Sequence, residues 1–283
     1  MNNVYIMSAN RSAIGGFGGT LKNHCPVDLG TLVAKEAIAR SGYEANEVEH
    51  AVFGNVIHTE PRDMYVSRVI ALQAGMDKAS AALTVNRLCG SGLQAIVSAS
   101  QILMLGDASV VMAGGVEVMS NGAHIVQGFR WGSRMGDGQV HDMMLGALHD
   151  PFGHGHMGIT AENISSRYQI SREMQDEFAL TSQKRAYEAI ENGAFKDQIL
   201  PIEIKTRKGI EIFEIDEHPK PETSMETLTG LRTAFKKDGV VTAGNASGIN
   251  DGASALVLAN EEKAKKGKPV SYTHLTLPTK RIV

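Results

Sequence analysis

The segment that most constrains this chain is NRLCGSGLQA, residues 86–95, which lies between two apolar patterns. The run at residues 81–85 precedes it, and an apolar pattern with helical spacing follows it to Leu105. Cys89 is therefore expected where a strand or loop turns into a helix. The first turn of a helix leaves backbone N–H groups without intrahelical partners, and the helix dipole favours negative charge there. This position favours the thiolate form of Cys89.

The residues beside Cys89 are small. Gly90 and Gly92 leave room for another molecule to approach the sulfur, and Ser91 can help to cap the helix. A thiolate near N–H groups that can hold a developing oxyanion is the arrangement that nucleophilic acyl transfer requires. A structural cysteine, which behaves as a small hydrophobic residue, is the alternative. At this point the residues leave both interpretations open.

Composition indicates an ordinary globular protein. The chain has 283 residues and a net charge of −3, so nothing favours a nucleic acid or an anionic membrane as partner. The two cysteines, Cys25 and Cys89, are far apart, which argues against a disulfide framework or a thiolate metal site. The N-terminus lacks the pattern of a signal peptide, and we expect no apolar run near the ~18 residues of a membrane span. These features predict a cytoplasmic protein.

Strand and helix patterns alternate along the first part of the chain, which predicts an α/β sheet covered on both faces. Strands are predicted at 3–9, 48–57 and 109–113, and helices at 27–40 and 64–74. In the second part the predicted helices are 160–167, 171–193 and 225–235, and the predicted strands are 199–204, 210–215 and 253–258.

Two further segments invite a ligand interpretation. The glycine-rich segment at residues 15–19 could cradle a phosphate, but it lacks the GxGxxG spacing, so a flexible turn is favoured. His149, His154 and His156 invite a metal, but their spacing fits no common zinc pattern. We therefore expect no metal site.

Four motifs together resemble the thiolase family, over about residues 1–269. They are residues 86–92 (NRLCGSG), 106–120 (GDASVVMAGGVEVMS), 156–163 (HMGITAEN) and 240–253 (VVTAGNASGINDGA). The resemblance implies a thiolase fold of the α/β class. Residues 1–120 and 245–268 would form an N-terminal αβα domain, and residues 121–244 an inserted loop domain that contributes to tetramerisation and CoA binding.

The resemblance also implies roles for individual residues. Cys89 would be the nucleophile, and His156 and Met157 would line a small acyl pocket beside it. The other residues implied to bind CoA or the acyl group are Leu148, Lys220, Thr227, Phe235, Ala243 and Ser247. Ser247 would offer its hydroxyl to the pantetheine amides, and Lys220 and Thr227 would lie near the nucleotide. CoA would act as the carrier of the substrate, and no cofactor is implied.

The family pattern is not followed to the end of this sequence. Thiolases take a histidine and a second, acid–base cysteine from a C-terminal repeat domain, and we expect that domain to be missing here. Residues 269–283 do not resemble the family and are interpreted as a probable artefact of translated adaptor sequence, so His274 is a poor candidate for the missing base. The chain as written is therefore expected to be inactive.

The expected family activity is that of an acetyl-CoA C-acetyltransferase, which condenses two acetyl-CoA molecules to acetoacetyl-CoA and catalyses the reverse thiolysis. His156 before Met157 and Gly158 favours this activity over that of a degradative 3-ketoacyl-CoA thiolase. A β-ketoacyl synthase and a non-catalytic CoA-binding protein also stay open as hypotheses. The full-length protein is expected to be a homotetramer or a dimer, with the loop at residues 128–137 helping dimers to pair.

Overall fold

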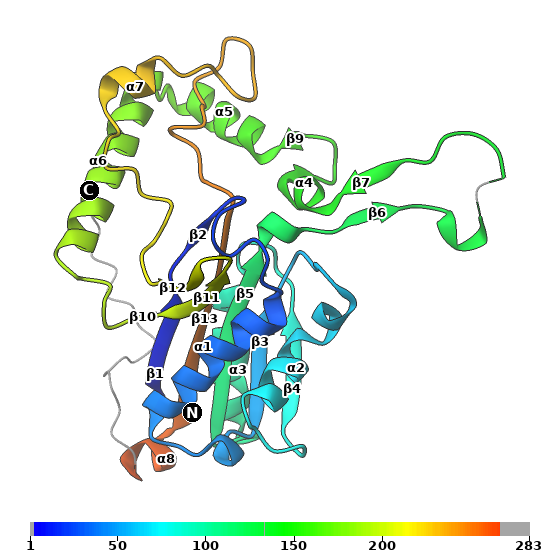
Figure 1. Cartoon of the computed structure of the whole chain (residues 1–283), viewed down its shortest axis with the longest axis vertical. Coiled ribbons are helices and arrows are strands. Elements are labelled where there is room, and N and C mark those ends of the chain that lie inside the picture. Colours follow the sequence, from blue (N-terminus) through cyan, green and yellow to red (C-terminus); the bar gives the residue numbers. More distant parts are fainter. Residues whose placement is uncertain (1–2, 133, 267–283) are drawn as a thin grey trace.

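The computed structural model describes residues 3–132 and 134–266, and a seven-stranded mixed sheet lies at its centre (Figure 1). Its strands are β1 (Val4–Ser12), β2 (Gly15–Gly16), β3 (His50–Gly54), β4 (Ala81–Val85), β5 (Val110–Val118), β10 (Ile199–Leu200) and β13 (Asn250–Asn260). The order is β10-β1-β13-β5-β3-β4, and β2 pairs with β13. The predicted tail, residues 269–283, and the last two residues of the predicted segment 245–268 lie outside the described residues.

Helices cover both faces of the sheet, as the alternation of patterns predicts. They are α1 (Pro26–Ser41), α2 (Val66–Gln73) and α3 (Ser91–Leu105). Val110 and Met112 of β5 belong to the core that contains α1 and α2, whereas Val111 and Ala113 belong to the core of α3. Because successive side chains of a strand point to opposite faces, the apolar strand β5 contributes to both cores.

Strand β13, near the end of the described chain, pairs with β1 at its beginning. It lies between β1 and β5 and is antiparallel to both, with Val4 opposite Asn260 and Asp251 opposite Val118. By contrast, β5, β3 and β4 run parallel, so their carboxyl ends meet at one edge of the sheet. That edge is where ligands bind in sheets of this kind.

Between β5 and β13 the chain makes a long excursion, and in the described part of it β10 is the strand that returns to the sheet, where it pairs with β1. Its helices are α4 (Met143–Leu148), α5 (Met157–Tyr168), α6 (Arg172–Glu191) and α7 (Met225–Thr229). Its strand pairs are β6 (His124–Val126) with β7 (Val140–Asp142), β8 (His149–Asp150) with β9 (Gly155–His156), and β11 (Ile202–Thr206) with β12 (Gly209–Phe213). Figure 1 shows β6 and β7 projecting as an arm.

Short helices complete the chain. They are η1 (Ala45–Glu47), η2 (Pro61–Tyr65), η3 (Met119–Asn121), η4 (Phe129–Trp131) and α8 (Glu261–Lys266).

Buried carboxylates hold part of the excursion together. Glu162 on α5 is 3% exposed and accepts hydrogen bonds from the backbone N–H groups of Val240 and Val241. Asp176 on α6 is fully buried and is held by Arg172 and by the amide of Asn245. Buried backbone donors need acceptors, and at residues 240–241 the Glu162 carboxylate provides them.

The predicted elements are present with shifted ends, except that the strand predicted at 199–204 is divided at Pro201 into β10, which pairs with β1, and β11, which pairs with β12. Ser171 caps α6 as predicted, because its hydroxyl accepts a hydrogen bond from the Met174 N–H at 3.2 Å. The helix predicted at 225–235 is only the short α7, and Gly230 follows it. The strand predicted at 109–113 is longer, because β13 provides partners as far as Val118. The strand predicted at 48–57 is shorter and stops at Gly54.

Helix α3 corrects one expectation. The window Leu88–Leu105 has 18 residues, a mean hydropathy of 1.5 and 28% of its residues buried, so one helix among the described residues is long and apolar enough to cross a membrane. The expectation of no such run was wrong. This observation is weak evidence for a membrane span, because a core helix of a soluble protein passes the same test. The buried face of α3 packs on the sheet, whereas Leu93 and Leu105 are exposed.

A substitution at Gly54 tests the contact between the sheet and α3. A Cβ at this position would lie 2.7 Å from Ser91 Cβ and 2.8 Å from the Ser91 carbonyl carbon. We expect Gly54→Ala to lower the free energy of unfolding by about 1–3 kcal/mol, because overpacking forces the backbone to move. Urea denaturation measures the effect. At Gly92 a Cβ would meet nothing within 4 Å, so Gly92→Ala is the control and should be neutral or stabilising. Equal losses of unfolding free energy in the two variants would contradict the account.

Candidate active site

Cys89 lies in a tight turn, residues 86–90, that links the end of β4 to α3. The cysteine is exposed and directly precedes Gly90, the N-cap residue of α3. Leu88 has a φ of 49°, in the left-handed region that residues with side chains rarely adopt. Strain of this kind persists only where surrounding contacts enforce it, and it is concentrated at functional sites. The predicted position of Cys89 at a helix start is therefore observed, with a strained residue beside it.

Ser91 holds this turn, and this corrects its predicted role as a helix cap. The N-cap is Gly90, which makes no side-chain hydrogen bond. The Ser91 hydroxyl instead accepts a hydrogen bond from the Arg87 N–H at 2.8 Å and donates one to the Leu88 carbonyl at 2.6 Å. Because both bonds close the turn across Cys89, Ser91 fixes the strained backbone rather than the first helical N–H groups.

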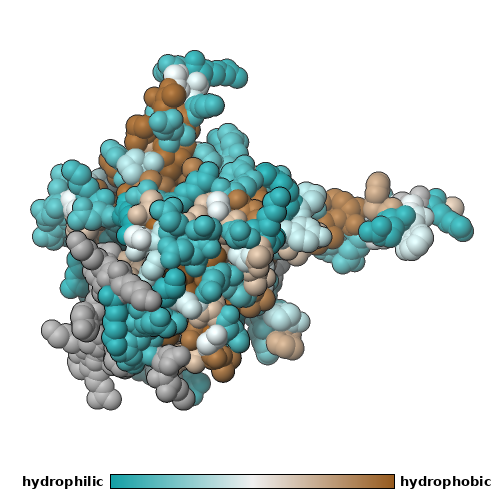
Figure 2. Space-filling view, turned by 90° about the horizontal axis from the view of Figure 1, so that it is seen from below, coloured by the Kyte–Doolittle hydropathy of each residue, from teal (hydrophilic) through white to brown (hydrophobic). Residues whose placement is uncertain are grey.

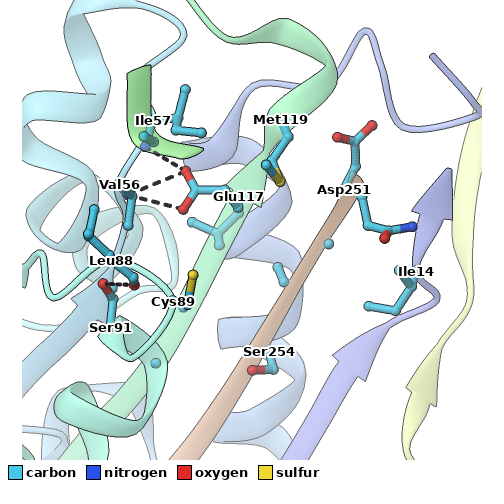
Figure 3. A pocket seen from close by; sticks show the side chains of 18 of the residues that line it. Ile14, Val56, Ile57, Leu88, Cys89, Ser91, Glu117, Met119, Asp251 and Ser254 are labelled. Carbon is cyan, nitrogen blue, oxygen red and sulfur yellow. Dashed lines mark hydrogen bonds between the residues drawn. The ribbon is translucent and has the colours of Figure 1, made fainter. Parts of the chain in front are cut away.

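Cys89 lines a cavity of about 480 Å³ at the carboxyl edge of the parallel strands (Figure 3). Residues after β3, the Cys89 turn, β5, α4 and β13 all contribute to its wall. Its lining includes Val56, Ile57, Leu88, Glu117, Met119, Leu148, Asp251 and Ser254. Leu148, which the sequence predicted as a substrate contact, is thus brought to the same cavity as Cys89.

Glu117 is an ionisable residue of this cavity that the sequence analysis did not single out. Its carboxylate accepts hydrogen bonds from the backbone N–H groups of Val56 and Ile57 (Figure 3). It also accepts one from the side chain of Asn55. Burial raises the pKa of Glu117 to about 7, against the lowering effect of these hydrogen bonds and with a smaller upward contribution from Asp63. A carboxyl group within an apolar strand such as β5 is the sequence signal that could have identified it.

Asp251 is the second acidic residue on the cavity wall. It is 1% exposed, and its Oδ1 accepts a hydrogen bond from the Ser120 N–H at 2.9 Å. Its Oδ2 has no hydrogen-bond partner among the described residues. The described lining of the cavity contains no histidine and no second cysteine.

His156 belongs to a separate aromatic cluster at the start of α5. Its ring stacks on Phe235 with the centroids 4.7 Å apart, and His149 meets it edge-on at 5.1 Å. Nδ1 of His156 accepts a hydrogen bond from the Gly158 N–H. Burial, with a smaller contribution from His149, lowers the pKa of His156. The structure thus brings His156 and Phe235 together, beside the exposed Met157, but none of the three lines the Cys89 cavity in the described residues.

The remaining predicted contacts lie on exposed segments. Lys220 precedes α7, and Thr227 is committed to a capping box with Ser224 at the start of that helix. Ala243 and Ser247 are exposed in the loop before β13, and the Ser247 hydroxyl donates to the Gly248 carbonyl. Their roles in CoA binding stay predictions.

The glycine-rich segment does surround an anion, but the anion belongs to the same chain. The N–H groups of Gly16 and Thr20 donate to the Glu217 carboxylate, at 2.8 and 3.3 Å. A Cβ on Gly19 would clash with the Glu217 carboxylate. The donors that a phosphate would need are therefore occupied. Over residues 3–132 and 134–266, no group of three or more His, Cys, Asp or Glu residues could hold a metal ion.

Known proteins match this chain over most of its length. Residues 4–262 match the model of the thiolase N-terminal domain. Beta-ketothiolase BktB of Cupriavidus necator is 53% identical over 278 residues, which cover 96% of this chain and 71% of that protein. The crystal structure of Bacillus anthracis acetyl-CoA acetyltransferase has a TM-score of 0.90 and 48% identity, covering 94% of this chain and 67% of that one. Human mitochondrial 3-ketoacyl-CoA thiolase in complex with CoA has a TM-score of 0.90 and 39% identity, covering 95% and 68%.

An exposed cysteine at a helix start, beside a cavity at the carboxyl edge of a parallel sheet, is an arrangement that suits a nucleophilic cysteine. The chain belongs to the thiolase family. The predicted family and the predicted thiolase fold are thereby confirmed. The chain spans 67–71% of the length of the three relatives above.

The two cysteines should differ in reactivity. Burial and a hydrogen bond to Asp28 raise the pKa of the Cys25 thiol to about 11. At pH 8 only about one Cys25 in a thousand would then be ionised, and the thiolate is the reactive form. We expect iodoacetamide to label the exposed Cys89 well before Cys25, as followed by peptide mass mapping. In Cys89→Ser, labelling should stay slow at every site; faster labelling of Cys25 in the unmodified chain would contradict this prediction.

Glu117 should make stability depend on pH. Its pKa is about 7 in the folded chain and 4.5 for the unperturbed group, so the folded state binds the proton more tightly. The resulting stabilisation is present below pH 4.5 and is lost as the pH rises through 7, by on the order of 3 kcal/mol. Glu117→Gln removes this dependence. In urea titrations from pH 4.5 to about 7.5, the free energy of unfolding of the wild type should therefore fall relative to that of Glu117→Gln. A difference between the two that does not change with pH would contradict the prediction.

Proposed function

We propose that this chain provides the acyl-accepting half of an acetyl-CoA C-acetyltransferase. The observation that carries the proposal is the exposed Cys89 in a strained turn at the start of α3, at the wall of a largely apolar cavity. An acetyl group is small and apolar, and the sulfur is accessible to it. The names of the relatives, acetyl-CoA acetyltransferase among them, support this interpretation.

In the proposed reaction the Cys89 sulfur attacks the carbonyl carbon of acetyl-CoA. The carbon–sulfur bond to CoA breaks, CoA leaves as its thiol, and the acetyl group stays on Cys89 as a thioester. A base then removes a proton from the methyl carbon of a second acetyl-CoA. The resulting carbanion attacks the thioester, so that acetoacetyl-CoA forms and Cys89 is released. The reverse sequence is thiolysis.

This second half of the reaction needs a general base, which contributes roughly 10²–10⁴-fold in rate. The described cavity lining offers Glu117 and Asp251 but no histidine and no second cysteine. Both oxygens of Glu117 accept hydrogen bonds from the backbone of residues 56–57, and Asp251 is fully buried and accepts one from Ser120 through Oδ1. We therefore propose that residues 1–283 alone accept an acyl group but do not complete the condensation.

CoA is proposed as the carrier of the substrate, with acetyl-CoA and acetoacetyl-CoA as ligands and with no metal or redox cofactor. Leu148 would meet the acyl end, because it already lines the Cys89 cavity. His156, Met157, Phe235 and Ala243 would extend the binding surface. Ser247 would meet the pantetheine, and Lys220 and Thr227 the nucleotide. The exposed positions of Lys220 and Ser247 are compatible with these roles.

Thiolysis of longer 3-ketoacyl-CoA substrates is the second candidate function. It is favoured by the 53% identity to a beta-ketothiolase and by the close match to human 3-ketoacyl-CoA thiolase. The two candidates share Cys89 and the same first step. They differ in the length of the acyl chain that the site accepts.

We also propose a homotetramer or dimer for the full-length protein, in the cytoplasm. The arm formed by β6 and β7 projects from the molecule, and apolar side chains lie along it (Figures 1 and 2). At its tip Trp131 is 87% exposed and Met135 is 97% exposed. Exposed apolar groups of this size are typical of surfaces that meet another chain. Both cysteines are free, which fits a reducing compartment.

The first test is the release of CoA thiol from acetyl-CoA, followed with a thiol reagent. We expect one equivalent of CoA per chain and then no further turnover, since acetylation needs only Cys89 whereas condensation needs a base. Cys89→Ser should abolish the release, and Cys25→Ser should leave it unchanged. Continuous formation of acetoacetyl-CoA would contradict the proposed lack of a base. No release with any acyl-CoA would instead favour a non-catalytic CoA-binding protein.

Repeating the assay with longer acyl-CoA donors separates the two candidate functions. The acetyltransferase function predicts that acylation slows as the chain lengthens beyond acetyl. Equal or faster acylation by longer chains would favour the 3-ketoacyl-CoA thiolase.

A further inference from the structure

The loop at residues 55–57, called here the facing turn, forms the cavity wall near Cys89. Val56 and Ile57 line the cavity together with Cys89 and Leu88. The facing turn follows β3, just as the Cys89 turn follows the neighbouring strand β4. It has few partners of its own: the Asn55 N–H donates to the Val85 carbonyl at 3.3 Å, a long hydrogen bond.

Glu117 accepts most of the other hydrogen bonds of the facing turn, and the Val116 carbonyl accepts a further one from the Asn55 amide at 2.9 Å. Its Oε1 accepts from the Ile57 N–H at 2.8 Å and from the Asn55 amide at 2.9 Å, and its Oε2 accepts from the Val56 N–H at 3.1 Å. The dashed lines of Figure 3 show the carboxylate turned toward Val56 and Ile57. One side chain of β5 thus holds two consecutive backbone amides of the cavity wall.

The facing turn is connected to the nucleophile by close packing. Gly54 precedes it and lies so near the start of α3 that a Cβ would meet Ser91 Cβ at 2.7 Å and the Gly92 nitrogen at 3.0 Å. Ser91 in turn bonds both Arg87 and Leu88, on either side of the strained position. A displacement of residues 54–57 must therefore also displace Ser91 and the Cys89 turn, because atoms packed at these distances cannot move independently.

The carboxylate is retained at a cost in stability. Glu117 forms no ion pair with any lysine, arginine or histidine of the described residues. Burial is the main cause that raises its pKa to about 7, and the nearby Asp63 adds to it. A buried, uncompensated carboxyl group is unfavourable for folding, and groups of this kind are concentrated at functional sites.

We propose that Glu117 is a positioning residue for Cys89: its carboxylate fixes the facing turn and, through Gly54 and Ser91, the Cys89 turn. This inference rests on the proposed role of Cys89 as the acyl acceptor. When Glu117 is ionised, both oxygens accept hydrogen bonds. When it is protonated, one oxygen carries a hydrogen that faces backbone donors, so the wall loosens.

The ionisable groups around Glu117 come from several elements. Asp63 on η2 is the charged group that acts on it, while Arg11 on β1 and Asp251 on β13 share its cavity. Arg11 is held by Asp216 at 2.7 Å and so is already paired. Protonation of Glu117 near neutral pH should therefore change the conformation of the Cys89 turn. The charge of Asp63 should influence the pH at which half of Glu117 is protonated.

The test follows backbone amide signals by nuclear magnetic resonance in the 283-residue chain across pH. We expect the amides of Val56, Ile57 and Cys89 to move with one shared midpoint near pH 7. Glu117→Gln should remove that midpoint from all three. If Val56 and Ile57 titrate but Cys89 does not, Glu117 is only a local structural residue and the proposal is overturned.

Alkylation of Cys89 by iodoacetamide, in a Cys25→Ser background, gives the chemical readout. Below pH 7 the wild type and Glu117→Gln both carry a neutral side chain, so their rate constants should agree within about twofold. Above pH 7 the two should diverge by about threefold or more, because only the wild type gains the charged carboxylate. A ratio of rate constants that does not change with pH would overturn the proposal, since a merely structural defect acts equally at every pH.

Two further variants complete the design. Asp63→Asn removes the neighbouring charge and should move the wild-type midpoint to lower pH, which keeps the test valid if Glu117→Gln fails to fold. An unmoved midpoint would contradict the assignment to Glu117. Glu162→Gln is the matched control, because Glu162 is also a buried carboxylate that holds two consecutive backbone amides, but outside this cavity. It should leave the Cys89 profile unchanged.

Failure of this inference is distinguishable from failure of the proposed function. Release of CoA by Cys89 without a pH-linked response would overturn only the role of Glu117. The pH-linked response without release of CoA would leave the positioning contact in place and overturn the acyl transfer.

Discussion

Three segments of this chain, one of them beside Cys89, depend on carboxylates that accept hydrogen bonds from backbone N–H groups. Glu117 holds residues 56–57, Glu217 holds the glycine-rich turn, and Glu162 holds residues 240–241. Residues 56–57 and 240–241 lie outside the named strands, and an unsatisfied buried donor there would cost about 1–3 kcal/mol. Acidic side chains from distant parts of the sequence accept these hydrogen bonds, and Glu117 is the one of the three that lies on the wall of the Cys89 cavity.

The sheet supplies the other half of the arrangement. Because β3, β4 and β5 run parallel, the facing turn, the Cys89 turn and Glu117 all come to one edge. Strand β13, more than a hundred residues further on, closes the same cavity with Asp251 and Ser254. The chemistry therefore lies on loops held by a rigid scaffold, which is where reactive groups are usually found. The strain at Leu88 is tolerated because Ser91 and Asn86 bond the turn from both sides.

Local patterns in the sequence were sufficient to predict much of the fold and the position of the nucleophile. The position of Cys89, the helices α1 and α6 and the α/β class follow from apolar periodicity and caps, which act over a few residues. The contacts that complete the site do not. Glu217 lies 201 residues from Gly16, and Glu117 lies 60 residues from Ile57, so no local pattern reveals either pair. The expected cap at Ser91 failed for a different reason: its hydroxyl bonds Arg87 and Leu88, which are near it in sequence, because the chain turns sharply there.

The most direct test of the account is to locate the acetyl group after exposure to acetyl-CoA. The chain is incubated at about pH 9, where an ordinary thiol is largely ionised without a base, and digested for peptide mass mapping. The account predicts an acetyl thioester on Cys89, with Cys25 unmodified because its thiol, of pKa about 11, stays protonated. Acetylation of Cys25 in preference to Cys89, or of neither, would contradict the claim that the Cys89 turn is built to accept an acyl group.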